Sequence, residues 1–482
     1  MSLRPVFSCS TDEVCVSAGE QGTCEAAGVC AFPDRSCPGS GRRYGTYAGP
    51  GLAGECVAGT ADAGVDAVDD ASPDGAGEAG SDGGGDGAPE AGPDGGDDGP
   101  PACGDLGEPC CPAPADACHG GLACAGDACS CVAQIAAGGN FACAVKTSGA
   151  LLCWGQNNKG QIGDGSRTNR PTPVTVTLPG GVGVAAVALG GYHTCARGTD
   201  GSLWCWGDNW AGQLGDATWN SSNDPVAAAV TRPVTRVNAG GTHTCALYDD
   251  DTLWCWGWNQ DGQVGDSSQT NRNSPQHILD QAAAATAGEN HTCGLLLNGT
   301  LWCWGGNGGG QIGDNSHTTR LAPVEVSSSF APVEVIAGGY HNCARTGAGG
   351  MYCWGQDWQG ALGDGGGDDR LVAVSVPAWG TVTRLTAGIN HTCVVHTDGT
   401  ALCSGEDAEG RLGHGATGNQ LTPAAVVGGQ AWSALAAGYG HTCGRTRTGG
   451  IFCWGDNTYG QSGDGAGGAN RLEPAAVSLG CP

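Results

Sequence analysis

The sequence predicts an all-β protein: a seven-bladed β-propeller with one disulfide per blade, preceded by small disulfide-rich modules and an acidic disordered linker. Three observations predict the propeller: a repeat of 48 to 52 residues, a cysteine pair at constant spacing in every repeat, and glycines in phase with the repeat. A period in this range is typical of propellers and solenoids. In each pair the second cysteine follows the first by ten residues, and the expected disulfides join Cys143 and Cys153, Cys195 and Cys205, Cys245 and Cys255, Cys293 and Cys303, Cys343 and Cys353, Cys393 and Cys403, and Cys443 and Cys453.

Residues 193–207 illustrate how one repeat is expected to fold. Two apolar segments flank a Thr-Asp-Gly turn, which predicts a β-hairpin. The middle of the turn is five residues from Cys195 and five from Cys205, so the two face each other on adjacent antiparallel strands, at a separation that suits a disulfide. The same register places Thr194 opposite Trp206, a small residue opposite a large one.

The turn and the flanking segments complete the predicted blade. The sixth residue after each first cysteine is glycine in six repeats and Asp251 in the third, as a hairpin turn with a left-handed last residue requires. Segments such as Val184–Leu189 before the hairpin and Pro173–Val176 after it supply two more strands. Four strands in about 50 residues match a propeller blade.

Cys131 and Cys481 fall outside the pairs, one just before the first repeat and one just after the last. We expect a disulfide between them that closes the ring. In a solenoid these ends would be ~100 Å apart.

The chain is expected to have four parts. Residues 1–56 hold six cysteines and form a small disulfide-rich module, residues 57–102 carry twelve Asp or Glu and no Lys or Arg and form a disordered linker, residues 103–130 form a small disulfide knot, and residues 131–482 form the propeller.

Composition constrains partners and location. The formal net charge of −28 argues against nucleic acid, which needs clustered Lys and Arg. Twenty-eight cysteines indicate an oxidising location, secreted or in the cell envelope. Residues 1–7 (MSLRPVF) lack the apolar core of a secretory signal, so we expect either a start further upstream or another export route. No apolar run is long enough to span a membrane.

The motifs G-x-x-H-T-C-A, W-C-W-G-x-N and G-Q-[ILV]-G-D stand in order in residues 190–216 and 240–266. This pattern resembles the repeat of the regulator of chromosome condensation family, over about residues 132–480. The resemblance implies a seven-bladed propeller. The family's eukaryotic founder is a guanine-nucleotide exchange factor, but the disulfides and acidic linker here look more like secreted bacterial members, of the myxobacterial type.

Two sets of repeated polar residues suggest metal sites but have simpler explanations. The histidines at one repeat position lie on different blades and are replaced by Phe141 in the first repeat, so we expect a structural role with the ring N–H bonded to a neighbouring backbone group. The Asp of G-Q-x-G-D, replaced by His414 in the sixth repeat, is expected to form a turn, and no D-x-D-x-D calcium loop is present. We therefore expect no metal and no cofactor.

Four tryptophans are the candidate binding residues. Trp210 and Trp358 occupy a loop position at which the other repeats have no aromatic residue, and Trp258 and Trp219 lie in nearby loops. Exposed tryptophan is enriched at interaction hot spots. The tryptophans before glycine in W-C-W-G, in contrast, are expected to be core residues.

The function we expect is a secreted or surface-anchored, non-catalytic binding scaffold that presents propeller loops to a protein or glycan partner. One alternative is a carbohydrate-active or other hydrolytic enzyme with carboxylates at a mouth of the central channel. The other is a regulator similar to a guanine-nucleotide exchange factor. A binder should show Trp210, Trp258 and Trp358 on one exposed face, whereas an enzyme should show converging acids. No catalytic residue is expected.

Overall fold

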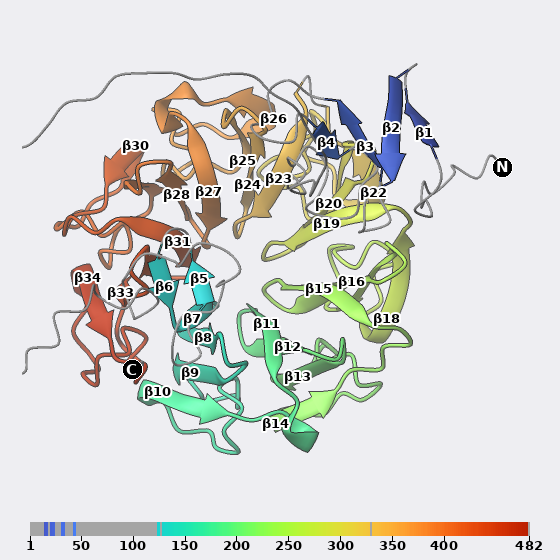
Figure 1. Cartoon of the computed structure of the whole chain (residues 1–482). Helices are drawn as coiled ribbons and strands as arrows, with labels where there is room; N and C mark the ends of the chain where they lie inside the picture. The colour runs from blue at the N-terminus through green and yellow to red at the C-terminus, as the bar shows by residue number, and fades with distance from the viewer. Residues whose placement is uncertain are drawn as a thin grey trace, which may run out of the picture. The chain divides into compact units, whose positions relative to one another are not determined.

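A computed structural model describes residues 131–480 except 328 and 329, and within residues 1–130 only the backbone of six short strands. The chain divides into two units, Met1–Gly95 and Gly96–Pro482. In the second unit, seven four-stranded antiparallel sheets surround a central channel (Figure 1). The predicted seven-bladed propeller is confirmed.

Each blade uses four consecutive strands, and the first of the four lines the channel. The blades are blade 1, β7 (Val132–Ala137), β8 (Phe141–Lys146), β9 (Leu151–Gly155) and β10 (Arg170–Val176); blade 2, β11 (Val184–Leu189), β12 (His193–Gly198), β13 (Leu203–Gly207) and β14 (Ser222–Ala227); blade 3, β15 (Val234–Ala239), β16 (His243–Tyr248), β17 (Leu253–Gly257) and β18 (Arg272–Leu279); blade 4, β19 (Ala282–Ala287), β20 (His291–Leu296), β21 (Leu301–Gly305) and β22 (Arg320–Glu325); blade 5, β23 (Pro332–Ala337), β24 (His341–Thr346), β25 (Met351–Gly355) and β26 (Arg370–Ser375); blade 6, β27 (Val382–Ala387), β28 (His391–His396), β29 (Ala401–Gly405) and β30 (Gln420–Ala425); and blade 7, β31 (Trp432–Ala437), β32 (His441–Thr446), β33 (Ile451–Gly455) and β34 (Arg471–Val477).

The remaining elements are short. The 3₁₀ helices η2 (Pro179–Gly181) and η3 (Pro377–Trp379) lie in connections between blades, β1 (Val14–Ser17), β2 (Glu20–Cys24), β3 (Cys30–Pro33) and β4 (Arg42–Tyr44) form one sheet, and β5 (Ala123–Ala125) pairs with β6 (Ala128–Ser130). The predicted modules and linker within residues 1–130 otherwise lie outside the described residues, so their boundaries stay predictions.

The hairpin register is the predicted one. In blade 2, Cys195 lies opposite Cys205 and Thr194 opposite Trp206. The two cysteine Cα atoms are 4.1 Å apart, close to the spacing of a non-hydrogen-bonded antiparallel pair. Asp251, which replaces glycine in the third hairpin, has the expected positive φ of 61°.

Every blade contains the disulfide that the cysteine spacing predicts. In each case the bond joins the second strand of the blade to the third, as the register of the hairpin requires. The bonded pairs, from blade 1 to blade 7, are Cys143 with Cys153, Cys195 with Cys205, Cys245 with Cys255, Cys293 with Cys303, Cys343 with Cys353, Cys393 with Cys403, and Cys443 with Cys453.

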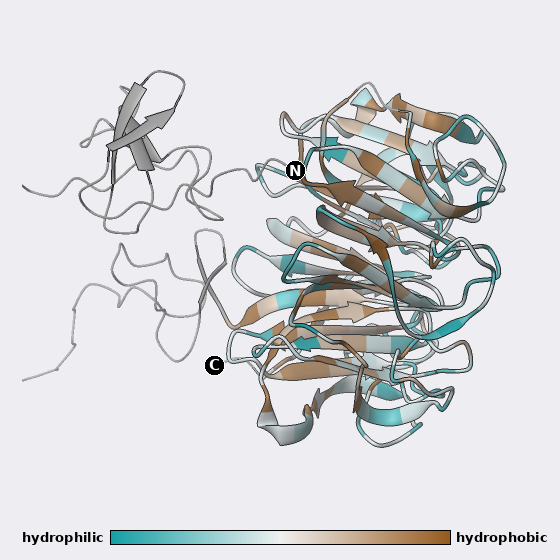
Figure 2. Cartoon of the chain, turned by 90° about the vertical axis from the view of Figure 1, so that its right-hand side faces the viewer, coloured by the Kyte–Doolittle hydropathy of each residue, from teal (hydrophilic) through white to brown (hydrophobic). Residues whose placement is uncertain are grey.

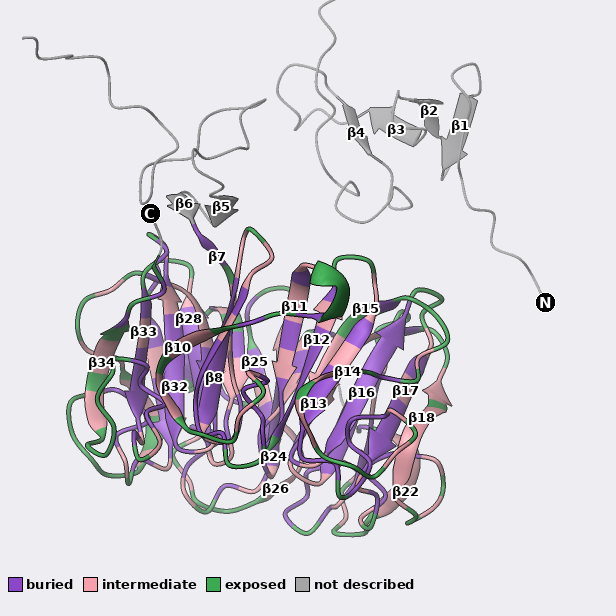
Figure 3. Cartoon of the chain, turned by 90° about the horizontal axis from the view of Figure 1, so that it is seen from below, coloured by how far each residue is buried: buried purple, intermediate pink, exposed green. Residues whose placement is uncertain are grey.

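The core of the propeller lies between neighbouring blades. Apolar residues follow the strands and hydrophilic residues gather in the loops (Figure 2). The second and third strands of a blade, such as β12 and β13, are largely buried, whereas a fourth strand such as β18 is only half-buried (Figure 3). One cluster joins Val145 and Ile162 of blade 1 to Val187 and Trp206 of blade 2.

A tryptophan on the third strand forms a hydrogen bond to the preceding blade. Trp206 Nε1 donates to the Gln161 carbonyl oxygen at 2.9 Å. The same bond joins Trp256 to Gln213, Trp304 to Gln263, Trp354 to Gln311 and Trp454 to Arg411. Trp154 makes it to Gln461 of blade 7 at 2.9 Å, so the interface between the last blade and the first has the same contact as five of the other six.

The expected disulfide between Cys131 and Cys481 stays a prediction. Cys131 is disulfide-bonded. Cys481 lies outside the described residues.

Histidines form a second inter-blade contact. His193 Nε2 lies 2.8 Å from Thr244 Oγ1 of the next blade, and Thr244 Oγ1 donates its proton to the Gln213 carbonyl oxygen at 2.8 Å. The histidine therefore donates through Nε2–H. The expected structural role fits this geometry, but the expected backbone partner was wrong, because a side chain of the next blade accepts the bond. The same contact joins His243 to Thr292, His291 to Asn342, His341 to Thr392 and His391 to Thr442.

Blade 6 lacks the third-strand tryptophan and has a replacement from elsewhere in the chain. Ser404 stands at that position, opposite Thr392. The fully buried Trp379 of η3 fills the space, and its Nε1 donates to the Leu362 carbonyl oxygen at 2.9 Å. A Cβ on Gly363 would come within 2.8 Å of the Trp379 ring and 3.0 Å of Ser404 Oγ. Trp379 therefore takes the place of the missing core tryptophan.

Removing the blade disulfides should prevent folding. Each bridge closes a loop of ten residues, which the chain-entropy model values at roughly 2–3 kcal/mol. Seven such contributions exceed a typical domain stability of about 5–15 kcal/mol. Urea unfolding followed by tryptophan fluorescence should show that a Cys195→Ala/Cys205→Ala variant loses about 2–3 kcal/mol. Denatured, reduced protein should refold only after the reductant is removed, and full refolding in reductant would contradict the expectation.

Candidate interaction face

One side of the propeller carries the loops that interrupt the repeat pattern. Because the strands of a blade are antiparallel, the turn between strands one and two and the loop between strands three and four emerge on the same side. We name this side the loop face. It consists of turns 138–140, 190–192, 240–242, 288–290, 338–340, 388–390 and 438–440 and of loops 156–169, 208–221, 258–271, 306–319, 356–369, 406–419 and 456–470.

A buried asparagine holds each long loop together in blades 1 to 4. Asn157 Oδ1 accepts from the Ile162 backbone N–H at 2.9 Å. Its Nδ2 donates to Asp164 Oδ1 at 3.1 Å and to the Ser166 and Thr168 carbonyl oxygens at 3.2 and 3.1 Å. No role was predicted for this asparagine, although its recurrence in W-G-x-N was a visible signal.

The aspartate of G-Q-x-G-D supports the same loop. Asp164 Oδ1 accepts from the Ser166 backbone N–H at 3.0 Å, as a turn former does. Its other oxygen lies 2.6 Å from Arg170 Nε at the start of the fourth strand. The pKa of Asp164 is lowered: burial opposes the lowering, but the hydrogen bonds from Ser166 and Arg170 and the arginine's charge outweigh it.

All four predicted tryptophans lie on the loop face. Trp210, Trp219 and Trp358 are 54%, 49% and 60% exposed, and Trp258 is half-buried. Trp210 of blade 2 contacts Trp258 of blade 3, with ring centroids 4.9 Å apart. Trp358 belongs to blade 5 and forms no part of this pair. The structure thus brings two of the four together in one aromatic patch.

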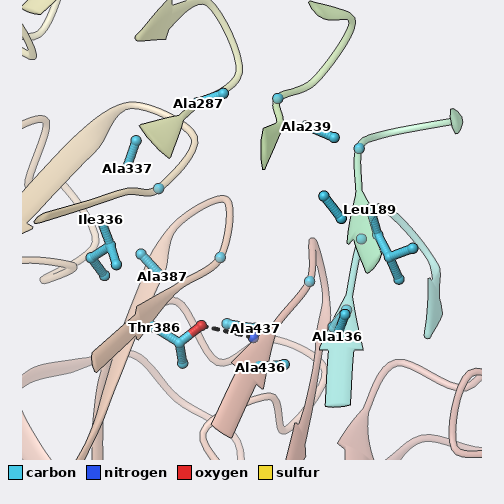
Figure 4. Close-up of a pocket in the computed structure, with 18 of the residues that line it drawn as sticks. Ala136, Leu189, Ala239, Ala287, Ile336, Ala337, Thr386, Ala387, Ala436 and Ala437 are labelled. Carbon is cyan, nitrogen blue, oxygen red and sulfur yellow. Dashed lines mark hydrogen bonds between the residues drawn. The ribbon is translucent and has the colours of Figure 1, made fainter. Parts of the chain in front are cut away.

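The central channel encloses a cavity of about 510 Å³ lined by first strands of all seven blades. Small residues dominate the wall, as Figure 4 shows for Ala136, Ala239, Ala287 and Ala437. The Ala437 backbone N–H donates to Thr386 Oγ1 of the neighbouring blade at 3.2 Å.

A hydrogen-bonded pair crosses the channel at the loop face. The Tyr439 hydroxyl of blade 7 donates to Glu289 Oε2 of blade 4 at 2.6 Å. A Cβ on Gly191 would lie 2.5 Å from the Tyr439 hydroxyl, and a Cβ on Gly241 would lie 2.5 Å from the Glu289 carboxyl. Both turns therefore need glycine. Burial raises the pKa of Glu289, and burial and the adjacent Glu289 raise the pKa of Tyr439 well above its usual value. The pair bridges blades 7 and 4 at this mouth of the channel.

A buried arginine supports the same mouth. Arg411 replaces the glutamine of G-Q-x-G-D in blade 6 and is 4% exposed. Its guanidinium donates to Glu406 Oε2 at 2.7 Å, to Glu409, and to the Tyr439 carbonyl oxygen at 3.1 Å. This cluster was not predicted from the sequence, although Arg411 departs visibly from the repeat.

The carboxylates that line the cavity do not converge. Glu289 lies in a turn at the loop face beside Gly339, since its backbone N–H donates to the Gly339 carbonyl oxygen. Glu334 lies five residues before Gly339 in the chain, which is roughly 16 Å at the usual rise of a strand. Its Oε2 pairs with Arg345 Nε at 3.0 Å. The paired carboxyl groups of glycosidases are about 5–9.5 Å apart.

The sequence profile of the RCC1-like domain matches residues 103–378, and that of the RCC1 repeat matches residues 432–461. The chain belongs to the RCC1-like domain family. The secreted bacterial subtype stays a prediction.

Curated relatives match this RCC1-like chain over one portion only. Human HERC2, an E3 ubiquitin-protein ligase, is 37% identical over 108 residues, which are 22% of this chain and 2% of HERC2. The mitochondrial RCC1 domain-containing protein RUG3 of Arabidopsis thaliana is 33% identical over 94 residues, which are 20% of this chain and 21% of RUG3. The chain therefore spans a small part of the relatives it matches.

Solved structures share the fold. Human WBSCR16 superposes with a TM-score of 0.59 at 21% identity, covering 64% of this chain and 85% of that one. Yeast RCC1 (Prp20), solved bound to Kap60, superposes with a TM-score of 0.61 at 17% identity, covering 73% and 85%. Another Prp20p structure from Saccharomyces cerevisiae was described with its binding to Gsp1p and histones. At these identities the likeness shows the fold alone.

No helix among the residues that the structure describes is long and apolar enough to cross a membrane.

Proposed function

We propose that this RCC1-like propeller is a non-catalytic binding scaffold whose loop face binds a protein partner. The exposed tryptophans of that face carry the proposal. Trp210 and Trp358 occupy a position that the other blades fill with Asn158, Gln260, Gly308, Ala408 and Thr458. No packing requirement of the blade explains an aromatic residue there.

The chemistry of the loop face favours one kind of partner. The Trp210–Trp258 pair offers a compact apolar surface, and tryptophan is the residue type most enriched at binding hot spots. The turns and loops around it contain sixteen Asp or Glu and three Lys or Arg. Five arginines that begin fourth strands pair with loop aspartates and leave an acidic surround. A partner with an apolar centre and a basic rim fits this face best.

Relatives support a protein rather than a glycan as the partner. Yeast RCC1 was solved with Kap60, and Prp20p was described binding Gsp1p and histones. These are properties of those proteins. They motivate the choice of protein partner for this propeller.

The alternatives have less support. A hydrolytic enzyme would need paired carboxylates, whereas Glu289 lies in a loop-face turn and Glu334 lies within the strand β23, paired with Arg345. For a regulator similar to an exchange factor, the direct test is release of labelled GDP from a small GTPase. The seven buried disulfides favour an oxidising compartment, secreted or at the cell surface, which is also where we place the scaffold.

A capture experiment tests the loop face. Immobilised propeller should recover a protein from the envelope fraction or culture fluid of the source cells. A Trp210→Ala/Trp358→Ala variant should lose at least about tenfold in affinity, since hot-spot truncation costs about 2 kcal/mol or more. Leu297→Ala is the matched control, because Leu297 is also an exposed apolar residue, at 59%, but lies in the hairpin turn on the opposite side.

Three outcomes would count against the proposal. Equal recovery by the double variant and the Leu297→Ala control would exclude the tryptophans as binding residues. Recovery of a glycan and no protein would show that the partner is a glycan. Accelerated GDP release would favour the exchange-factor alternative.

A further inference from the structure

The asparagine that organises the long loops is replaced in two blades. Blades 1 to 4 and blade 7 have Asn157, Asn209, Asn259, Asn307 and Asn457, whereas blades 5 and 6 have Asp357 and Asp407. An asparagine amide donates two hydrogen bonds, but an ionised aspartate only accepts. The exchange therefore puts an oxygen where the other loops have a donor.

The loop of blade 5 keeps the standard conformation around this oxygen. Asp357 Oδ1 accepts from the Leu362 backbone N–H at 2.8 Å, as Asn157 Oδ1 does in blade 1. The Gly366 backbone N–H donates to Asp364 Oδ1 at 2.8 Å, and the Asp357 backbone N–H donates to Asp369 Oδ1 at 2.9 Å. Asp357 Oδ2 thus takes the position of the amide nitrogen.

No N–H group bonds to the buried Asp357 Oδ2, the Asp357 carboxyl lies against that of Asp364, and the Asp357 residue is 0% exposed. In blade 1 the equivalent nitrogen has four oxygens within 3.2 Å: Asp164 Oδ1, the Ser166 hydroxyl, which has no counterpart at Gly366, and two carbonyl oxygens. The corresponding groups in blade 5 are Asp364 Oδ1 and the carbonyls of Gly366 and Asp368. An oxygen surrounded by oxygens is costly to bury unless a positive species joins them.

Blade 6 contains its own compensation. His414 replaces the loop aspartate there, and its Nδ1 lies 3.2 Å from Asp407 Oδ2. The second exchange places an imidazole ring beside the buried carboxylate, although the two atoms form no well-directed hydrogen bond. Blade 5 keeps Asp364, whose Oδ2 pairs with Arg370 at 2.6 Å, and has no histidine beside Asp357 Oδ2. Its loop, residues 356–369, contains four aspartates and no Lys or Arg.

We propose that the blade 5 loop binds one calcium ion through Asp357 Oδ2, Asp364 Oδ1 and the backbone carbonyls of Gly366 and Asp368. Calcium prefers carboxylate and carbonyl oxygens and accepts irregular geometry, with water completing its shell. The described residues contain no group of three or more His, Cys, Asp or Glu side chains able to hold a metal. This site instead takes half of its protein ligands from the backbone. Asp364 alone does not predict a metal site, because the contribution of Asp357 depends on the fold.

Calcium titration of the full chain at pH 7 tests the site. Calorimetry should show one equivalent with a dissociation constant of about 10⁻⁴–10⁻³ M, the range of extracellular calcium modules. Calcium should also raise the melting temperature of the protein. Terbium should show luminescence sensitised by Trp358, which directly follows Asp357 in the chain, and Trp358→Phe should weaken that luminescence without changing calcium affinity.

Two variants should abolish the binding without harming the fold. Asp357→Asn restores the residue of blades 1 to 4, and Asp364→His recreates the pair of blade 6. Asp407→Asn is the matched control and should bind calcium normally. Asn307→Asp, which creates the same pair with Asp314 in blade 4, should add a second equivalent.

Other results would overturn the proposal. Calcium binding that survives in Asp357→Asn would locate the ion elsewhere, for example at the acidic segment 57–102. No calorimetric heat, no terbium signal and no change in melting temperature at millimolar calcium would show that a proton alone occupies the blade 5 loop.

Discussion

Acidification from pH 7 to pH 4 should unfold the propeller cooperatively. Six histidines are buried, five of them bonded to the next blade, and burial lowers the pKa to about 3 for His193, His243 and His341, to about 4 for His291 and His441, and well below the usual value for His391. In the unfolded chain these rings bind protons below about pH 6.5. The stability that the neutral histidines contribute is therefore complete above pH 6.5 and is lost as the pH falls toward 3.

Buried carboxyls with a raised pKa act in the opposite direction and reduce the net effect. Burial raises the pKa of Asp357 to about 7 and that of Asp407 to about 6, so the folded state binds protons there first. Between pH 6 and 5, the unfolded state binds about five protons on these histidines, whereas the folded state binds about two protons on Asp357 and Asp407. The net uptake of about three protons removes about 4 kcal/mol per pH unit.

Urea unfolding at constant ionic strength, followed by tryptophan fluorescence between pH 7.5 and 4, measures this slope. His441→Phe is the informative variant. Blade 1 already has Phe141 at the histidine position, and it has Ala142 where other blades carry the side chain that bonds to the histidine of the preceding blade. The variant should take up about one proton fewer on unfolding and should unfold at lower pH. An unchanged slope would contradict the histidine assignment.

Trp379→Ala should be the most damaging single core substitution outside the blade strands. The fully buried indole fills the space beside Ser404, and truncation of a buried tryptophan costs about 3–5 kcal/mol. Ser404→Trp alone should also destabilise the fold, by about 1–3 kcal/mol, because it overfills the same space.

The two substitutions together should compensate. In Trp379→Ala/Ser404→Trp the indole returns to the third strand, where blades 1 to 5 and blade 7 carry it, and most of the lost free energy of unfolding should be recovered. Urea denaturation of the four proteins gives the coupling energy. A double variant no more stable than Trp379→Ala would show that the two sites are independent.

Contacts within one repeat were predictable from the sequence, and contacts across the ring were not. The Cys195–Cys205 register followed from the position of the turn, because a hairpin fixes its own pairing. The Tyr439–Glu289 bond joins residues 150 positions apart and depends on the diameter of the channel. Trp379 lies outside the phase of the repeat, so the missing tryptophan at Ser404 carried no sign of what replaces it.

The candidate site was predictable to a similar extent. Departures from the repeat correctly marked Trp210 and Trp358 as surface residues, since a residue that the blade does not require is free to face solvent. Asp357 is also a departure, but its meaning depends on which oxygens surround it. That information comes from the folded loop.

Each blade is complete in itself, because its four strands are consecutive and none of the described sheets combines strands from both ends of the chain. The interface of Trp154 with Gln461 repeats the interface of Trp206 with Gln161. The ring consequently has no intrinsic starting point. A circular permutant that joins the present ends of the propeller and opens the connection between any two blades should keep every interface, with a different blade at the front of the chain.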